Sequence, residues 1–146
     1  MKDLRPLIRL HRWQLDEKRR ALVELQTMLD NLYAQAKTLE DRIIEEQQAA
    51  RKTQEVAFVY PSFAKAAINS RKQLAFAISQ VEAQVSQAMD DIAEAFQDLK
   101  RYELAQEERV KAEKEQRRLR ENITLDETAA IRHRRRQEEE EAAQKQ

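Results

Sequence analysis

The sequence predicts an all-α protein: a long two-helix antiparallel coiled-coil hairpin with a charged C-terminal extension. The first observation is that the 146 residues include no glycine, whereas average usage would give about ten. Glycine supplies the left-handed turns of compact folds, so a chain without it favours long helices. The second is that apolar residues recur at alternating steps of three and four, as in a coiled coil. The third is a single break between two such stretches of similar length.

The first helix is predicted at about residues 4–55. Its seam keeps one heptad register for most of that length, and His11, Lys18 and Glu46 are its polar interruptions. Asp3 is a candidate N-cap, and Pro6 falls in the first turn, where a missing N–H costs little. The apolar seam residues are Leu4, Ile8, Leu15, Leu22, Leu25, Leu29, Leu32, Ala36, Leu39, Ile43 and Ala50.

The hairpin tip is predicted at about residues 56–62. Pro61 disfavours a helical conformation for Tyr60, and Ser62 could cap the next helix. Large apolar side chains gather here, including Phe58, Tyr60 and Phe63. They either close the end of the hairpin or form an exposed docking knob.

The second helix is predicted at about residues 63–121, with Arg71 as the one interruption of its seam. An antiparallel hairpin would bury both seams within one chain, whereas a parallel dimer of the whole chain would bury them between copies. The break at Pro61 and the similar seam lengths favour a monomeric hairpin. The seam residues are Ala67, Leu74, Ile78, Val81, Val85, Ala88, Ile92, Ala95, Leu99 and Tyr102.

The C-terminal part is predicted to be a charged extension. Beyond Tyr102 the second seam turns polar, so the helix is expected to continue alone. A break at Asn122-Ile123 would precede a short last helix, with Thr124 and Glu127 as its capping box. The short helix and a frayed tail together occupy about residues 124–146, and the whole chain 1–146 is one coiled-coil domain.

Charge is uneven although the net charge is zero. Residues 1–20 and 100–136 are each net +4, residues 21–99 are net −5, and residues 137–146 are net −3. A chain that folds back on itself would place the two basic stretches side by side. One end of the hairpin would then be basic and the other acidic.

The composition argues against an enzyme. Without glycine there is no glycine-rich phosphate loop or dinucleotide fingerprint, and without cysteine there is no thiolate metal ligand. His11 and His133 lie far apart in the sequence and have no acidic partner at metal spacing. We therefore expect no catalytic residues, no cofactor and no metal. No apolar run approaches the roughly 18 residues of a membrane span, so the chain is expected to be cytoplasmic.

Two exposed features indicate a binding role. Trp13 lies off the seam, close to Arg9 and Arg12 in sequence, which suggests a contact with a partner protein. The basic run at residues 132–136 has no interleaved aromatic residues for stacking on bases and is followed directly by four glutamates. We therefore expect protein docking or solvation there, and no nucleic-acid partner.

The C-terminal motif Leu125-Asp126-Glu127-Thr128-Ala129-Ala130-Ile131-Arg132, followed by Arg134 and Arg135, resembles the acidic-then-basic element of the FliJ family. FliJ proteins are small coiled-coil components of the flagellar type III export apparatus, with YscO-type analogues in injectisomes. The resemblance extends over nearly the whole length: a hairpin of this size, a central break and a charged C-terminal helix.

The resemblance implies a stalk or adaptor that inserts its paired terminal helices into a hexameric export ATPase (FliI-like) and promotes its assembly. It also implies contacts with the cytoplasmic domain of the export gate (FlhA-like) and with export chaperones. The protein would then lie at the cytoplasmic face of the inner membrane, attached through its partners only.

Site residues follow from the basic end and from the family's pattern. The basic end gives the expected ATPase contacts, which are Arg9, Arg12, Trp13, Arg101, Arg109 and Arg117. The resemblance implies gate contacts on the second helix just past the tip, at Ser70, Leu74, Ala77 and Val81. Leu74 and Ala77 match the family's residue types there, and Ser70 and Val81 differ from them.

Two alternatives to the stalk have no ATPase partner. A structural, self-associating coiled coil would form a concentration-dependent parallel dimer. A cargo-binding chaperone would need an exposed apolar groove, for which the alanines in the seam leave room.

Overall fold

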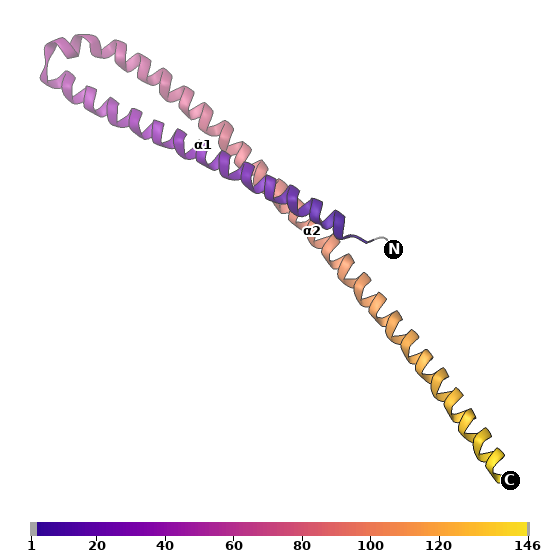
Figure 1. Ribbon diagram of the computed structural model, residues 1–146. Helices are drawn as coiled ribbons and strands as arrows, with labels where there is room; N and C mark the ends of the chain where they lie inside the picture. The colour runs from indigo at the N-terminus through magenta and orange to yellow at the C-terminus, as the bar shows by residue number, and fades with distance from the viewer. Residues whose placement is uncertain (1–2, 146) are drawn as a thin grey trace. The chain divides into compact units, whose positions relative to one another are not determined.

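The computed structural model describes residues 3–145 and contains two helices, α1 (Arg5–Lys52) and α2 (Gln54–Gln144) (Figure 1). The chain divides into two compact units. One unit is Arg9–Leu99, and the other combines Met1–Ile8 with Lys100–Gln146. No strand is present in the described part of the chain. The all-α prediction is therefore confirmed.

Within Arg9–Leu99, α1 and the first half of α2 run antiparallel and pack along the predicted seams (Figure 1). The seam residues are buried or half-buried, apart from the polar interruptions Lys18 and Arg71. Leu15, Leu99 and Val81 are the most buried large side chains of this unit, with 3%, 5% and 7% of their surfaces exposed. The helical hairpin is confirmed, and the heptad pattern identified its buried face.

Polar contacts at the edge of the seam hold the two helices in register. The hydroxyl of Tyr33 donates a hydrogen bond of 2.6 Å to the carboxylate of Glu82, and this bond raises the pKa of Tyr33. The guanidinium of Arg71 donates two bonds, of 2.7 and 2.9 Å, to the carboxylate of Glu40. Arg71 interrupts the apolar seam because it reaches across to the partner helix.

The chain reverses at Thr53, the one residue between the helices. Its N–H donates to the carbonyl of Ala49 and its carbonyl accepts from the N–H of Ala57, both at 3.1 Å, so helical hydrogen bonding continues through the break. No described residue has positive φ. A chain without glycine therefore turns without any left-handed residue.

The predicted tip boundary, residues 56–62, is wrong, because these residues belong to the start of α2. Pro61 lies inside α2, where its ring removes one N–H and crowds the carbonyl of Ala57. Proline bends a helix at such a position without ending it, and Figure 1 shows the beginning of α2 curving at the tip. The reversal is thus shared between Thr53 and the bend in α2.

The predicted break at residues 122–123 and the frayed tail are also wrong, because α2 continues to Gln144. Thr124 caps no new helix. Its hydroxyl donates to the carbonyl of Arg120 at 2.9 Å, and Thr128 does the same to Thr124 at 2.8 Å. Threonine makes such bonds four residues back inside helices. Beyond Pro61, strong helix formers predominate and neither glycine nor proline ends the helix.

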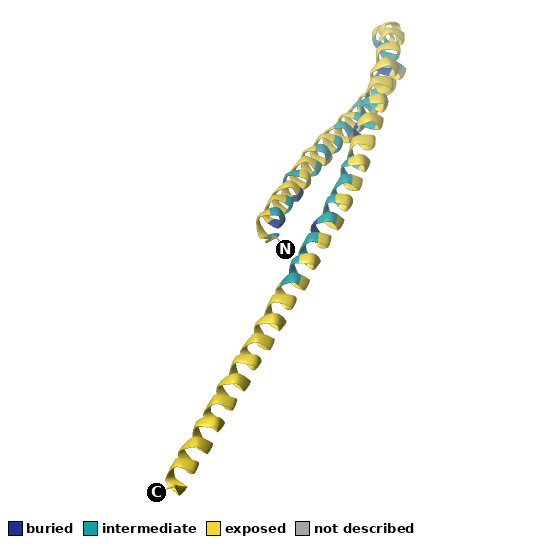
Figure 2. Ribbon diagram, turned by 90° about the vertical axis from the view of Figure 1, so that its right-hand side faces the viewer, coloured by how far each residue is buried: buried dark blue, intermediate teal, exposed yellow. Residues whose placement is uncertain are grey.

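Every residue from 110 to 145 is exposed, and the C-terminal part of α2 is coloured as exposed along its length (Figure 2). This segment is therefore a single charged helix, as the polar continuation of the seam predicted. Ion pairs one turn apart support it, such as Arg118 with Glu115 at 2.6 Å. This pair lowers the pKa of Glu115 and raises that of Arg118. Across the described residues, neither helix has an apolar stretch that could cross a membrane.

Candidate functional site

The N-terminus of α1 is fastened to α2 by a cluster that we call the N-terminal clasp: Asp3, Leu4, Gln106 and Arg109. The side-chain amide of Gln106 accepts a 3.1 Å hydrogen bond from the N–H of Leu4 and donates one of 3.3 Å to the carboxylate of Asp3. The guanidinium of Arg109 lies 3.5 Å from the same carboxylate. The two polar residues that continue the α2 seam therefore hold the start of α1.

Asp3 also organises the first turn of α1. Its carboxylate accepts a 3.1 Å hydrogen bond from the N–H of Arg5 and pairs with the Arg5 guanidinium at 2.9 Å. The bond from the Arg5 N–H is the main reason why the pKa of Asp3 is lowered, and the charges of Arg5 and Arg109 add to it. The predicted capping role of Asp3 is thus supported, since the charged carboxylate binds an otherwise free helix N–H.

Arg109 is not the free cation that the sequence suggested for an ATPase contact. Its side chain is only 17% exposed, and it pairs with Glu113 at 3.1 Å as well as with Asp3. Its Nε atom is buried without a hydrogen-bond partner. Reversing the charge of Arg109 would therefore disrupt the N-terminal clasp. Weaker ATPase binding by such a variant would not identify Arg109 as a contact residue.

We expect the N-terminal clasp to open in acid. A carboxylate whose pKa is lowered in the folded state stabilises the fold at pH values above its ordinary pKa, which is 3.8 for Asp3. This contribution disappears as the pH falls through the lower pKa of the folded state. Protonation weakens the ion pairs with Arg5 and Arg109. Amide hydrogen exchange of the first turn of α1 should accelerate below pH 3.8 relative to that of the second half of the helix.

Asp3→Asn is the matched variant for this prediction. It should show the faster exchange at neutral pH and lose the acid dependence. Equal protection of the first turn in both proteins at neutral pH would contradict a role for the carboxylate.

Arg9, Arg12 and Trp13 share one exposed side of α1, which we call the Trp13 face. Positions three and four residues apart are neighbours on a helix, and all three side chains are exposed. Trp13 has 61% of its surface in water. Two nearby arginines are engaged within α1, since Arg20 pairs with Glu17 at 2.7 Å and Arg19 approaches Asp16 at 3.7 Å. The three side chains therefore form one exposed surface of α1, as their spacing in the sequence predicts.

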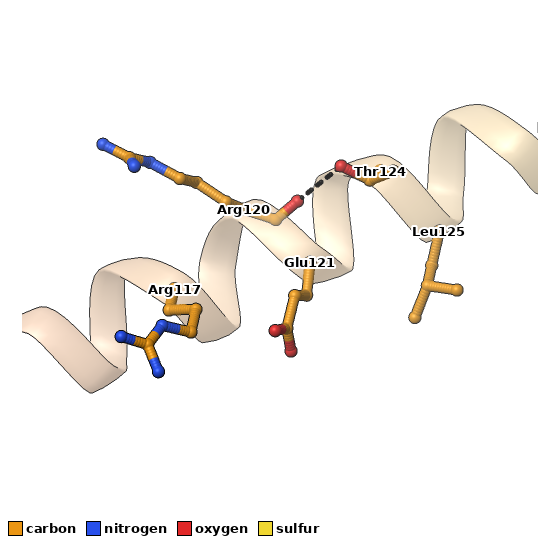
Figure 3. A pocket seen from close by; sticks show the side chains of 5 residues that line it. All are labelled: Arg117, Arg120, Glu121, Thr124 and Leu125. Atoms are coloured by element: carbon orange, nitrogen blue, oxygen red, sulfur yellow. Dashed lines mark hydrogen bonds between the residues drawn. The ribbon is translucent and has the colours of Figure 1, made fainter.

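Arg101 and Arg117 do not form one surface on α2. A helix turns by about 100° per residue, so residues sixteen apart differ by about 160° around the axis and lie about 24 Å apart. Both side chains are exposed. Arg117 lines a shallow hollow with Arg120, Glu121, Thr124 and Leu125 (Figure 3). Because one helix supplies all five side chains, this hollow cannot enclose a ligand.

The predicted gate-contact residues divide by burial. Ser70 is exposed, and Leu74 and Ala77 are half-buried. Val81 is only 7% exposed and belongs to the hairpin core, so it cannot also contact a partner while the hairpin stays closed. Ser70 and Leu74 contribute to an open groove between the helices; its α1 side is lined by Asn31, Ala34, Gln35, Thr38, Leu39 and Arg42.

The tip residues divide into a packed pair and a strongly exposed side chain. Tyr60 and Phe63 are half-buried, with their ring centroids 6.2 Å apart, and the guanidinium of Arg42 lies 5.5 Å from the Phe63 centroid. These contacts close the end of the hairpin. Phe58, by contrast, is 86% exposed, and Pro61 is exposed beside it. Phe58 thus takes no part in closing the hairpin and is the most exposed large apolar side chain of the tip.

The sequence analysis did not predict one feature of α2, a long stretch without carboxylates. Residues 56–81 contain no aspartate or glutamate, yet this stretch lies inside a segment whose average charge is acidic. The average over residues 21–99 concealed it, and counting the spacing between successive carboxylates would have revealed it.

No group of three or more histidine, aspartate or glutamate side chains is arranged to hold a metal ion among residues 3–145. Comparison of the chain with protein families, curated proteins and solved structures finds no match.

Proposed function

We propose that this protein is a non-enzymatic stalk of a type III protein export machinery, which binds a hexameric export ATPase (FliI-like) and promotes its assembly. The observation that carries the proposal is the pairing of the N-terminus of α1 with α2. The N-terminal clasp closes this pair at Gln106 and Arg109, and α2 continues beyond it as an exposed, charged helix. Paired, stiff terminal helices are what a stalk needs in order to enter a ring.

The Trp13 face supplies the proposed ATPase contact. Arg9 and Trp13 combine a cation with a large exposed aromatic side chain, the residue types that dominate protein interfaces. Tryptophan buries much area at a small cost in side-chain entropy, and arginine steers an acidic partner toward it. Arg101 and Arg117 extend the basic character along α2 without sharing one side of it.

The export-gate contact is proposed for the tip half of the hairpin. Ser70, Leu74 and Ala77 remain partly accessible, and the open groove beside Ser70 offers apolar surface to a partner. A gate domain (FlhA-like) or an export chaperone would bind there. Through these partners the protein would be held at the cytoplasmic face of the inner membrane.

The alternative of a parallel, self-associating coiled coil has less support. The hairpin buries both seams inside Arg9–Leu99, so the heptad pattern needs no second copy. A monomeric mass in solution is therefore expected.

The decisive experiment is ATP hydrolysis by the cognate export ATPase with and without this protein, together with the mass of the complex. Stimulated turnover with formation of a hexameric ring is expected. If turnover and assembly do not change, and the protein alone is a dimer, the stalk proposal is wrong and the structural coiled coil replaces it.

A further inference from the structure

The acid-free stretch of residues 56–81 is the longest in the chain. It covers 26 residues, and the next longest, residues 4–15, covers 12. Its basic residues are Lys65, Arg71 and Lys72. Because Arg71 is neutralised by Glu40, the two lysines supply the net charge of the exposed surface.

Exposed apolar side chains alternate with these lysines along one side of α2. Phe58 is 86% exposed, Ile68 51% and Phe76 67%, while Lys65 and Lys72 are exposed between them. From Lys65 to Phe76 the steps are three, four and four, which keep the side chains on one side of a helix. We call these five residues the outer face of α2.

The outer face points away from α1. Lys72 and Phe76 each lie about 200° around the helix from the seam residue Leu74, because each is two residues from it. The carboxylates of α1 are therefore across the width of α2 from the outer face. A partner approaching this side would meet lysines and apolar side chains, without any carboxylate of residues 56–81.

The chemistry of the outer face distinguishes between possible partners. A partner with diffuse negative charge explains why no carboxylate interrupts 26 residues, since protein interfaces usually pair charges of both signs. Nucleic acid is such a partner, but it selects flat side chains that stack on bases, and the exposed Ile68 cannot stack. An anionic bilayer accepts both kinds of apolar side chain and attracts lysine.

We propose that the outer face of α2 binds directly to the surface of an anionic phospholipid bilayer. Phe58, Ile68 and Phe76 would enter the boundary between headgroups and acyl chains, and the lysine ammonium groups would stay among the phosphates. The helix would lie on the membrane, since no helix in the described residues can span one. This attachment is separate from the proposed binding to an export ATPase and needs no protein partner.

The test is sedimentation of the full-length protein with vesicles that contain phosphatidylglycerol, compared with vesicles of phosphatidylcholine alone. The wild type should bind the anionic vesicles, and less so at high salt. Lys65→Glu with Lys72→Glu should weaken the partition coefficient by at least about tenfold. Phe58→Ser and Phe76→Ser should each weaken it by about tenfold.

Matched controls come from exposed residues elsewhere in the hairpin. Met89→Ser removes an apolar side chain that is 55% exposed on the acidic part of α2, and Lys37→Glu reverses an exposed charge on α1. Both should bind as the wild type does. Circular dichroism checks that every variant keeps its helicity.

Insertion of the side chain at position 58 into the bilayer is measured separately, by the fluorescence of a single tryptophan moved to that position. In a Trp13→Phe background, Phe58→Trp should shift its emission to the blue with anionic vesicles, whereas Trp13 in the wild type should not shift. Equal sedimentation with both vesicle types, equal losses in the controls, or an unshifted Trp at position 58 would each overturn the proposal. Loss of binding to a purified gate domain or to RNA in the Phe variants, without vesicle binding by the wild type, would assign the face to that partner instead.

ATP hydrolysis measured without lipid distinguishes the membrane proposal from the stalk proposal. The variants Lys65→Glu with Lys72→Glu, Phe58→Ser and Phe76→Ser, all of which keep Trp13, should stimulate an export ATPase as the wild type does. Vesicle binding without ATPase stimulation would leave the membrane proposal standing and remove the stalk.

Discussion

Leu15→Ala should lower the free energy of unfolding by about 2–5 kcal/mol, the usual range for removing a buried leucine side chain. Leu15 has only 3% of its surface exposed, and the cavity left behind cannot fill easily between two stiff helices. A small, largely exposed helical pair has little stability in reserve. The expected result is therefore a large fall in the urea midpoint, followed by circular dichroism.

Val23→Ala is the matched control for Leu15→Ala. It lies eight residues further along α1, is 60% exposed, and should change the stability by less than about 0.5 kcal/mol. Equal losses in the two variants would mean that the seam does not hold the hairpin together. A loss in Leu15→Ala that depends on protein concentration would indicate an intermolecular seam instead.

Arg9→Glu combined with Trp13→Ala should abolish measurable stimulation of the export ATPase and leave helicity intact. Truncating a tryptophan at the centre of an interface costs about 2 kcal/mol or more, a factor of about thirty in Kd. The reversed charge also repels the acidic surface that arginine is expected to meet. The measurements are ATP turnover against protein concentration and the mass of the complex.

Lys37→Glu with Met28→Ala is the control for the Trp13 face, because it makes the same kinds of change at exposed positions of α1. It should stimulate the ATPase normally. Binding of the wild type should also shift the emission of Trp13 to shorter wavelength, since the indole leaves water. If the double variant still stimulates and the emission does not shift, the contact lies elsewhere.

The paired part of the fold was predictable because its cause is local. Burial alternates along α1 and α2 as the heptads require, and residues as far along as Gln106 and Arg109 follow the same register. The reversal was harder to place. Proline at position 61 suggested an end to the helix, whereas the structure tolerates it as a bend and ends α1 at Lys52.

Helical spacing was enough to predict which residues share a face, but not which side chains make tertiary contacts. Arg9, Arg12 and Trp13 share a face because three- and four-residue steps determine it. The engagement of Arg109 with Asp3, a residue 106 positions away, cannot be read from local spacing. Thr124 was assigned as a cap because its alternative, a bond to the preceding turn, leaves no mark in the sequence.

Because only one non-helical residue separates α1 from α2, the number of residues in each helix determines which seam residues face one another. One residue inserted at Thr53 would rotate everything after it by about 100°, and Val81 and Leu99 would move from the core toward water. Most connections tolerate such changes because a loop absorbs them. Here we expect length to vary only by whole heptads removed from or added to both arms together, so the hairpin changes in steps of about 10 Å.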